Sequence, residues 1–266
     1  MLEFYHDNIS VCAQKVRLAL EEKRIEWQGF LVDLFKGEQV SPEYLAINPR
    51  GVIPAIVHDG HPVIESTVIL EYLDDAFPEM PLRPETALSR ATMRVFTKAP
   101  DDGIHVACGT VSYAAAFAGQ ALEFRGRDSV EDKLAKLPDR ARAARQKELL
   151  DKGMNASILP GYIRMFDKLF QEMEAALLDQ PWLAGETFSL AECALLPYLW
   201  RLERLNLDAM WADKPNLAGW FARAKERQSW DTAMEAYPPL APPGFDDDLK
   251  SKGVSHWPTV EAMLVA

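Results

Sequence analysis

The sequence predicts a mixed α/β domain that is followed by an all-helical domain. Strand-like apolar runs alternate with helical periodicity through residues 1–78. Within that stretch, Asp59 and Gly60 stand between two β-branched runs, which is the pattern of a β-hairpin. From Arg90 onward only helical periodicity remains, so we expect no strand there.

The first domain is predicted to have the element order β-α-β-α-β-β-α. The expected elements are a strand at 2–5, a helix at 11–23, a strand at 27–31, a short helix or turn at 41–47, hairpin strands at 55–57 and 62–64, and a helix from 65–66 to about 77. A β-α-β start implies a right-handed parallel crossover, and the hairpin adds an antiparallel edge. This combination is the thioredoxin-like arrangement.

Domain limits follow from where the pattern changes. We expect a first domain at 1–78, a proline-containing linker at 79–89, a helical domain at 90–240 and a tail at 241–266. The tail is rich in proline and acidic residues, and it either folds back over a pocket or stays loose.

The helical domain is expected to begin with a long helix at 90–124 that Pro100 and Gly103 break. The densely charged segment 126–153 needs no more than a solvated helical excursion. Further helices are expected at 158–178 and 217–228, and a capping box begins a buried helix, with Ser189 as N-cap and Glu192 three residues later.

Composition narrows the function classes. The net charge of −11 argues against nucleic-acid and anionic-membrane partners, because the field would repel phosphates. The three cysteines have neither a metal-ligand spacing nor a paired framework, so we expect no metal site and a reducing compartment. No apolar run is long enough to span a bilayer, and no signal peptide precedes the first strand. We therefore expect a soluble cytoplasmic protein.

A ligand site is outlined by the segment 48–70. Pro54 precedes a buried strand, where a residue without an N–H contributes shape and not strand pairing. Glu65 and Ser66 open a helix, and the unpaired N–H groups of a helix start suit a carboxylate. Together these parts could hold a small, extended molecule that carries a carboxylate beside a sheet edge.

Three side chains near the start of the first helix are candidates for chemistry. Ser10 is either the N-cap or a hydroxyl that stabilises an anion held at the 48–70 site. Cys12 lies in the same first turn, where a thiol pKa can fall, although its apolar neighbours favour a buried, inert thiol. Tyr5 either presents its phenol to the same place or packs half-buried.

The runs 5–23, 37–60 and 65–73 resemble, in order and spacing, the N-terminal domain of cytosolic glutathione S-transferases. The resemblance implies a cis proline at Pro54 and backbone pairing of Ile53 with the cysteinyl part of glutathione. It places Glu65 and Ser66 at the γ-glutamyl end. Gln39 matches a position that meets the glycine carboxylate, and Ser10 matches the catalytic serine of the serine-type classes.

Two positions depart from the family pattern. Many relatives have a lysine where this chain has Val52, so a charge on the glycine carboxylate is either absent or supplied by Arg50 or Lys36. Tyr5 falls near the catalytic tyrosine of other classes, which makes it an alternate to Ser10.

The implied chemistry is physically consistent. A glutathione thiol is only a few per cent thiolate at neutral pH. A hydrogen bond from Ser10 and the dipole of the first helix would lower its pKa by about one to two units. The thiolate of this co-substrate then attacks a hydrophobic electrophile, with the protein supplying position and an anion hole.

In the implied architecture the uncharged helix around 105–121 lines the electrophile pocket, so His105, Cys108 and Tyr113 are pocket candidates. A core histidine is the alternative for His105. The charged segment 126–153 and the run 93–102 are similar to the group that includes the bacterial β-etherases, which cleave lignin-derived aryl ethers with glutathione.

Other functions stay open at this point. The fold could hold glutathione or a hydrophobic ligand without turnover, or serve as an interaction module. A thiol transferase that depends on Cys12 is a further alternative. The family resemblance also implies a homodimer and a role in detoxification.

Overall fold

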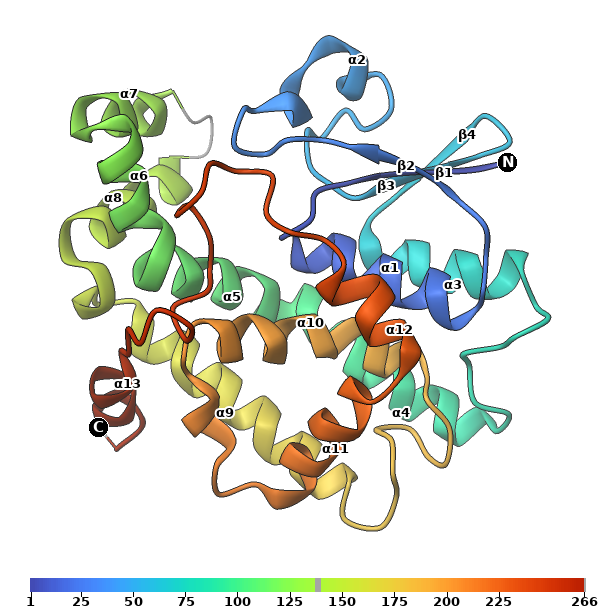
Figure 1. Cartoon of the computed structure of the whole chain (residues 1–266). Coiled ribbons are helices and arrows are strands. Elements are labelled where there is room, and N and C mark those ends of the chain that lie inside the picture. Colours follow the sequence, from blue (N-terminus) through green and yellow to red (C-terminus); the bar gives the residue numbers. More distant parts are fainter. Residues whose placement is uncertain (137–139, 266) are drawn as a thin grey trace. The chain divides into compact units, whose positions relative to one another are not determined.

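A computed structural model of the chain describes residues 1–136 and 140–265 (Figure 1). The chain divides into two compact units. The first unit comprises Met1–Asp101, Ala175–Pro197 and Asn216–Ala241, and the second comprises Asp102–Glu174, Tyr198–Pro215 and Pro242–Ala266. The domain limits inferred from the sequence stay a prediction.

A four-stranded mixed sheet forms the top layer of the first unit. Its strands are β1 (Leu2–His6), β2 (Gln28–Leu31), β3 (Ala55–His58) and β4 (His61–Ile64), in the spatial order β2-β1-β3-β4. β1 and β2 are parallel, whereas β1 with β3 and β3 with β4 are antiparallel. The hairpin turns at Asp59 and Gly60 with φ of 50° and 81°, as a turn with two left-handed residues requires. The predicted parallel pairing of the first two strands and the predicted hairpin are both confirmed.

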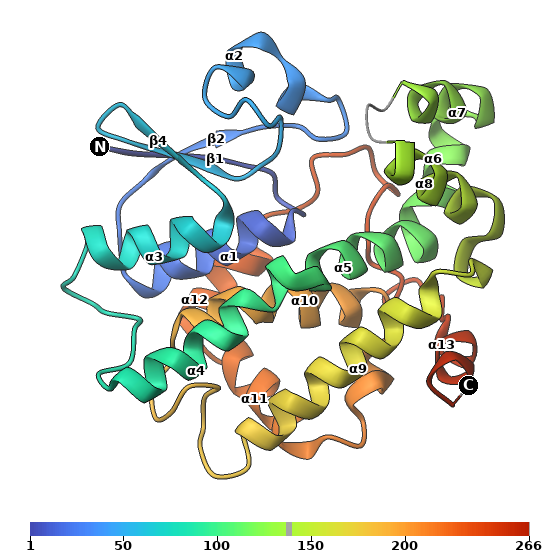
Figure 2. The ribbon, with the colours of Figure 1, turned by 180° about the vertical axis from the view of Figure 1, so that it is seen from behind.

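Three helices complete the predicted order β-α-β-α-β-β-α, which is confirmed. They are α1 (Val11–Glu22), α2 (Pro42–Leu45) and α3 (Ser66–Ala76). α1 and α3 lie side by side under one face of the sheet, and α2 lies on the other side (Figures 1 and 2). Along the chain, α1 follows β1 and α3 follows β4, so a strand leads into the N-terminal end of each helix.

The buried face of α1 is less apolar than the sequence suggested. Its apolar residues Val11, Val16 and Leu18 to Leu20 are buried, but Lys15 and Arg17 are also 0% exposed. Charged side chains are almost never fully buried unless they have partners. Their partners are described below.

The rest of the first unit is helical. α4 (Ala87–Lys98) begins after the N-cap Thr86, three residues before the expected start at 90. α11 (Pro215–Lys225), α12 (Gln228–Trp230) and a π-helical turn at Asp231–Glu235 follow later in the chain. The capping box is confirmed at the start of α10 (Leu190–Arg204): the Glu192 carboxylate accepts from Ser189 N at 2.8 Å and Ser189 Oγ at 2.7 Å.

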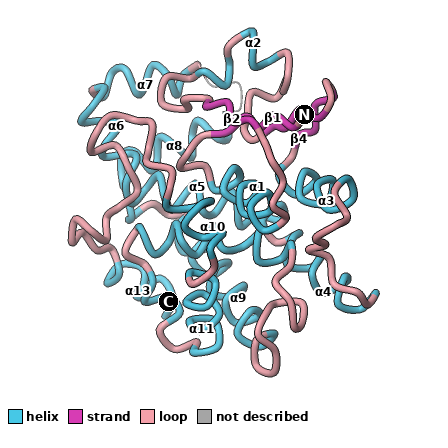
Figure 3. Tube along the Cα trace, turned by 45° about the vertical axis from the view of Figure 1, so that its right-hand side comes forward, coloured by secondary structure: helices cyan, strands magenta, loops and turns pink. Residues whose placement is uncertain are grey.

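The described part of the second unit contains helices and loops but no strand (Figure 3). Its elements are a π-helical turn (Pro100–Ile104) at the junction, α5 (His105–Ser112), a π-helical turn (Tyr113–Phe117), α6 (Ala118–Arg125), α7 (Arg127–Ala135), α8 (Arg140–Lys152), α9 (Leu159–Ala176) and α13 (Trp257–Val265), with 3-10 turns at Gly153–Asn155 and Asp208–Trp211. The expected break is confirmed, because Gly103 has a φ of 140° between α4 and α5. No helix in the described residues has the length and apolar character to span a membrane.

The described parts of the charged segment 126–153 are helical, as predicted, but they are more than a solvated surface. Exposed ion pairs such as Arg127 with Asp151, at 2.7 Å, cover its outer side. On its inner side, Val130, Leu134 and Leu150 join a small apolar cluster with Ala118 of α6. Residues 137–139 of the predicted excursion lie outside the described residues.

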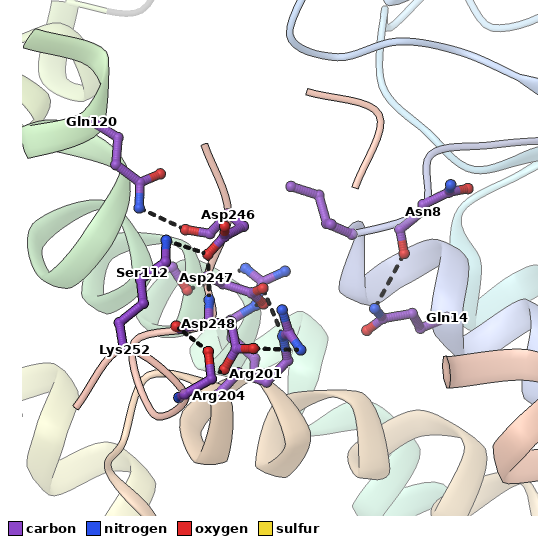
Figure 4. A network of polar contacts seen from close by, with 12 residues as sticks. Asn8, Gln14, Ser112, Gln120, Arg201, Arg204, Asp246, Asp247, Asp248 and Lys252 are labelled. Atoms are coloured by element: carbon purple, nitrogen blue, oxygen red, sulfur yellow. Dashed lines mark hydrogen bonds and ion pairs between the residues drawn. The ribbon is translucent and has the colours of Figure 1, made fainter. Parts of the chain in front are cut away.

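The tail is folded, so the loose alternative is wrong. Asp247 is 2% exposed and accepts hydrogen bonds from Arg201 Nε at 2.6 Å and Arg204 Nε at 2.7 Å (Figure 4). Burial alone would raise the pKa of Asp247, but the two guanidinium groups outweigh it and the pKa is lowered. Gln120 Nε2 of α6 donates to the Asp246 carbonyl at 2.7 Å. These contacts fasten the tail within the second unit.

Candidate active site

The loop before β3 is rigidly anchored. The Ile53–Pro54 peptide bond is cis, as the resemblance implied. Next to it, the Val52 carbonyl accepts from Tyr44 Oη at 2.7 Å and from Asn48 Nδ2 at 2.6 Å. Asn48 is fully buried, so the backbone of this loop is held in one position at the end of the sheet.

Glu65 links β4 to α3 in an unusual conformation. Its φ of 70° is left-handed although it is not glycine, and such residues cost on the order of 1–3 kcal/mol, which is typical of functional sites. Its side chain does not cap α3. The carboxylate, which is half-exposed, forms an ion pair with Arg50 instead.

Beneath Ser66 lies a lysine that the sequence analysis missed. Lys15 Nζ donates to Ser66 Oγ at 2.9 Å and to Thr67 Oγ1 at 3.1 Å. One signal could have found it, because Val11, Lys15 and Ala19 are spaced by four residues and therefore share the buried face of α1.

Ser10 is the N-cap of α1, as one of the two interpretations proposed. Its Oγ accepts from Ala13 N at 3.3 Å. This contact uses the oxygen as an acceptor, so the hydroxyl proton can still be donated. Capping the helix and donating to a thiolate are therefore compatible roles for one side chain.

The two alternates to Ser10 have different surroundings. Cys12 is half-buried, so the expectation of a buried thiol is wrong. Tyr5 Oη donates to Glu3 Oε2 at 2.8 Å, and its ring stacks on Phe30 at 4.8 Å. Burial, together with the Glu3 contact, raises the pKa of Tyr5 to about 12. These contacts favour the packing interpretation of Tyr5.

The loop that leads into Ser10 is fixed by a second buried charge that the sequence analysis missed. Arg17 donates to the carbonyls of Asn8 at 2.8 Å and Ala233 at 2.7 Å, and it contacts His6 Nδ1 at 3.1 Å. Burial, together with the Arg17 charge, lowers the pKa of His6 to about 3. Gln14 Nε2 also donates to the Asn8 carbonyl, at 3.3 Å (Figure 4).

The residues considered for the glycine carboxylate lie in the same unit. Gln39 is half-buried in the 3-10 turn Glu38–Val40, and within the described residues its buried Oε1 has no hydrogen-bond partner. Lys36 pairs with Asp33 at 3.0 Å, and Arg50 pairs with Glu65. Both cations that were considered as substitutes for a lysine at Val52 are thus engaged with carboxylates of this chain.

The three pocket candidates belong to the second unit. His105 is exposed, so the core alternative is wrong, and its Nδ1 lies 3.3 Å from Tyr198 Oη. Cys108 is 1% exposed, with its Sγ 4.0 Å from Ser112 Oγ. Tyr113 is half-buried, and burial raises its pKa. All the glutathione-site candidates belong to the first unit, and their roles and the pocket assignment both stay predictions.

Comparisons with known proteins agree with this geometry. Residues 9–76 match the family model "Glutathione S-transferase, N-terminal domain", and residues 140–223 match "Glutathione S-transferase, C-terminal domain". The chain is 33% identical to protein LigF of Sphingobium sp. (strain NBRC 103272 / SYK-6) over 201 residues, which is 72% of this chain and 75% of that protein.

Two further similarities extend along most of the chain. A tetrachloro-p-hydroquinone reductive dehalogenase of Sphingobium chlorophenolicum is 26% identical over 239 residues, 87% of this chain and 95% of that protein. The crystal structure of β-etherase LigF from Sphingobium sp. strain SYK-6 superposes with a TM-score of 0.78 and 29% identity, covering 88% of this chain and 99% of that one. The chain therefore belongs to the glutathione S-transferase family and is a glutathione-dependent transferase.

Proposed function

We propose that the protein activates glutathione as a thiolate through Ser10 and transfers it to a hydrophobic aryl ether. The observation that carries the proposal is the position of Ser10 at the start of α1, where its oxygen accepts from Ala13 N and its proton remains available. The N-terminal dipole of α1 favours the anion at the same place.

The remaining glutathione contacts are proposed along the first unit. Ile53 beside cis-Pro54 would pair with the cysteinyl backbone, and Glu65 with Ser66 would hold the γ-glutamyl end. Gln39 would meet the glycine carboxylate. Its buried oxygen supports this role, because the amide then has its two N–H donors to offer to an anion.

The aryl ether class is supported by the similarity to β-etherase LigF. In the proposed step the thiolate sulfur attacks the carbon that bears the ether oxygen. The C–S bond forms as the C–O bond breaks, and a phenolate leaves and takes up a proton. His105, Cys108 and Tyr113 are the side chains we propose for the pocket that receives the electrophile.

A second candidate rests on Cys12. This thiol is half-buried in the first turn of α1, and a helix N-terminus is one of the places where reactive cysteines occur in proteins. A Cys12-dependent thiol transferase would exchange disulfides with glutathione and would release no phenol. Non-catalytic ligand binding is the remaining alternative.

One experiment separates these candidates. Phenol release from a β-aryl ether and formation of the glutathione thioether are measured for the wild type, Ser10→Ala and Cys12→Ala. The proposal predicts that Ser10→Ala loses about 10²- to 10³-fold in kcat, as for the removal of an anion-stabilising donor, and that Cys12→Ala stays within about threefold. The reverse pattern, with disulfide exchange retained in Ser10→Ala, would establish the Cys12 reaction instead.

We also propose that the protein works as a homodimer in the cytoplasm, in detoxification of such electrophiles. Exposed apolar side chains on α3 and α4 support the dimer: Val68 is 55%, Leu88 80% and Val95 65% exposed. Glu71 and Arg94, 3.4 Å apart, join the two helices. Light scattering should give twice the monomer mass, and Leu88→Glu should reduce it.

A further inference from the structure

Lys15 is a buried cation whose direct contacts are hydroxyl groups. It is 0% exposed, and its ammonium donates to Ser66 Oγ and Thr67 Oγ1. Across residues 1–136 and 140–265, no carboxylate forms an ion pair with it. An ammonium buried without a direct counter-ion is costly, and an apolar side chain of similar length would fill the same space. The presence of a lysine at this position therefore needs an explanation other than packing.

The contact fixes the direction of the Ser66 hydroxyl. An ammonium has three donors and no acceptor, so the Ser66 oxygen must accept from Lys15. The Ser66 proton then has to point elsewhere. The neighbouring Thr67 obeys the same logic, because its Oγ1 accepts from Lys15 and donates to Asp101 Oδ1 at 3.2 Å.

Ser66 differs from Thr67 in that its proton has no acceptor in the described residues. Ser66 is 8% exposed and is the first residue of α3, where the backbone N–H groups of the first turn also point outward. A hydroxyl whose proton is left to donate, at a helix N-terminus and backed by a buried positive charge, fits a carboxylate, which can only accept.

We propose that Lys15 is a positioning residue for glutathione: it makes Ser66 an obligatory donor to the α-carboxylate of the γ-glutamyl end and places a buried positive charge behind that contact. The inference rests on the proposed function and adds a residue to it. The two hydrogen bonds, from Lys15 Nζ–H to Ser66 Oγ and from Ser66 Oγ–H to the carboxylate, run in the same direction, so each polarises and strengthens the other.

Other charged groups face Lys15 at longer range. Burial lowers its pKa, while Cys12, Asp101 and Glu65 act in the opposite direction. Asp101 and Glu65 are therefore the carboxylates that support the ammonium before the ligand arrives. The bound carboxylate would add to them and bring a negative charge to the outer side of Ser66.

The test compares two ligands and three proteins by calorimetric titration. The ligands are glutathione and 4-aminobutyryl-cysteinyl-glycine, which lacks only the α-carboxylate of the γ-glutamyl end. The proteins are the wild type, Lys15→Met, which keeps the length and loses the charge and the donors, and Lys15→Gln, which keeps a neutral donor. Circular dichroism and urea unfolding report whether each variant is folded.

We expect Lys15→Met to weaken glutathione binding by about tenfold or more, and to change binding of the truncated ligand by less than about threefold. The glutathione dissociation constant of Lys15→Gln should lie between those of the wild type and Lys15→Met, and its dissociation constant for the truncated ligand should stay unchanged. A lysine that serves only packing would weaken both ligands equally in either variant.

Two results would overturn the inference. One is an unchanged ratio of the two dissociation constants in the folded variants. The other is failure of both variants to fold, because a position that only lysine can fill holds α1 against α3 for structural reasons. Neither result touches the proposed function, which is tested separately by glutathione binding to the wild type and by the activities of Ser10→Ala and Cys12→Ala.

Discussion

Helix α1 carries two buried lysines, and the two have different kinds of partner. Lys23, at the C-terminal end, contacts the Asp74 carboxylate at 2.8 Å with both side chains at most 1% exposed, and Arg83 contacts the other oxygen of Asp74 at 2.8 Å. Lys15, near the N-terminal end, contacts hydroxyl groups, and one of these has a proton left to donate.

The difference separates structure from recognition within one helix. Burial alone would raise the pKa of Asp74, but the Leu82 N–H, Lys23 and Arg83 outweigh it, so the pKa is lowered and the carboxylate is fully used. At the other end, Ser10 and Ser66 each accept one hydrogen bond and keep a donor. A network with spare donors is what an anionic ligand can complete.

The largest expected effect comes from disrupting the contacts of Asp74 with Lys23 and Arg83 at the C-terminal end of α1. Asp74→Ala leaves Lys23 buried without a counter-ion and removes a partner of Arg83, so we expect a loss of about 3–5 kcal/mol in the free energy of unfolding. Urea unfolding measures it. Asp75→Asn is the matched control, because the Asp75 carboxylate also contacts Arg83 but is 65% exposed; it should cost less than about 1 kcal/mol.

Disrupting the contacts at the N-terminal end should affect binding more than folding. Ser66→Ala removes a hydrogen-bond donor to a charged group, so glutathione affinity should fall by about 10- to 100-fold. It also leaves Thr67 as the remaining hydroxyl partner of the buried Lys15, so stability should fall by about 1–2 kcal/mol, less than in Asp74→Ala. Titration calorimetry and urea unfolding measure the two quantities. Thr86→Ala, which removes the N-cap of α4, should show the opposite: about 1 kcal/mol of stability lost and affinity kept. A large stability loss in Ser66→Ala would erase the distinction between the two ends.

A smaller effect concerns pH. The pKa of His6 is lowered to about 3 in the folded protein by burial and by Arg17, against about 6.5 in an unfolded chain. As the pH falls below about 6.5, the unfolded chain gains a proton that the native state does not, so stability declines until about pH 3. Between pH 6.5 and 4.5 the decline due to His6 should be about 2 kcal/mol.

Urea midpoints at several pH values check this prediction. His6→Phe, which keeps a ring against Phe4 and cannot be protonated, should show a flatter dependence over the same range. Parallel curves for His6→Phe and the wild type would show that the acid sensitivity comes from other groups.

The elements that the sequence predicted well have local causes. The hairpin at Asp59-Gly60 needs only two residues that accept a positive φ, and the capping box at Ser189 and Glu192 closes across three residues. The helix start at Glu65-Ser66 was likewise readable from adjacent residues, whereas the cis form of Pro54 was expected from the family resemblance.

The parts that the sequence did not predict depend on distant partners. Lys15 meets a residue 51 positions away, and Arg17 meets the Ala233 carbonyl 216 positions away. Charged residues on a helix are normally exposed, so nothing in the local pattern indicates their burial. The sequence left the conformation of the tail undecided for the same reason. Asp247 becomes a buried anion only because Arg201 and Arg204, more than 40 positions earlier, contact it.

The central claim is that the N-terminal end of α1 activates a thiol. An ultraviolet titration of bound glutathione, comparing the wild type with Ser10→Ala, tests it most directly. We predict a thiol pKa about one to two units below that of free glutathione in the wild type, and loss of that shift in Ser10→Ala, which should still bind glutathione. A wild type that binds glutathione without a pKa shift, or an unchanged shift in Ser10→Ala, would contradict the account and leave Ser10 as a helix cap alone.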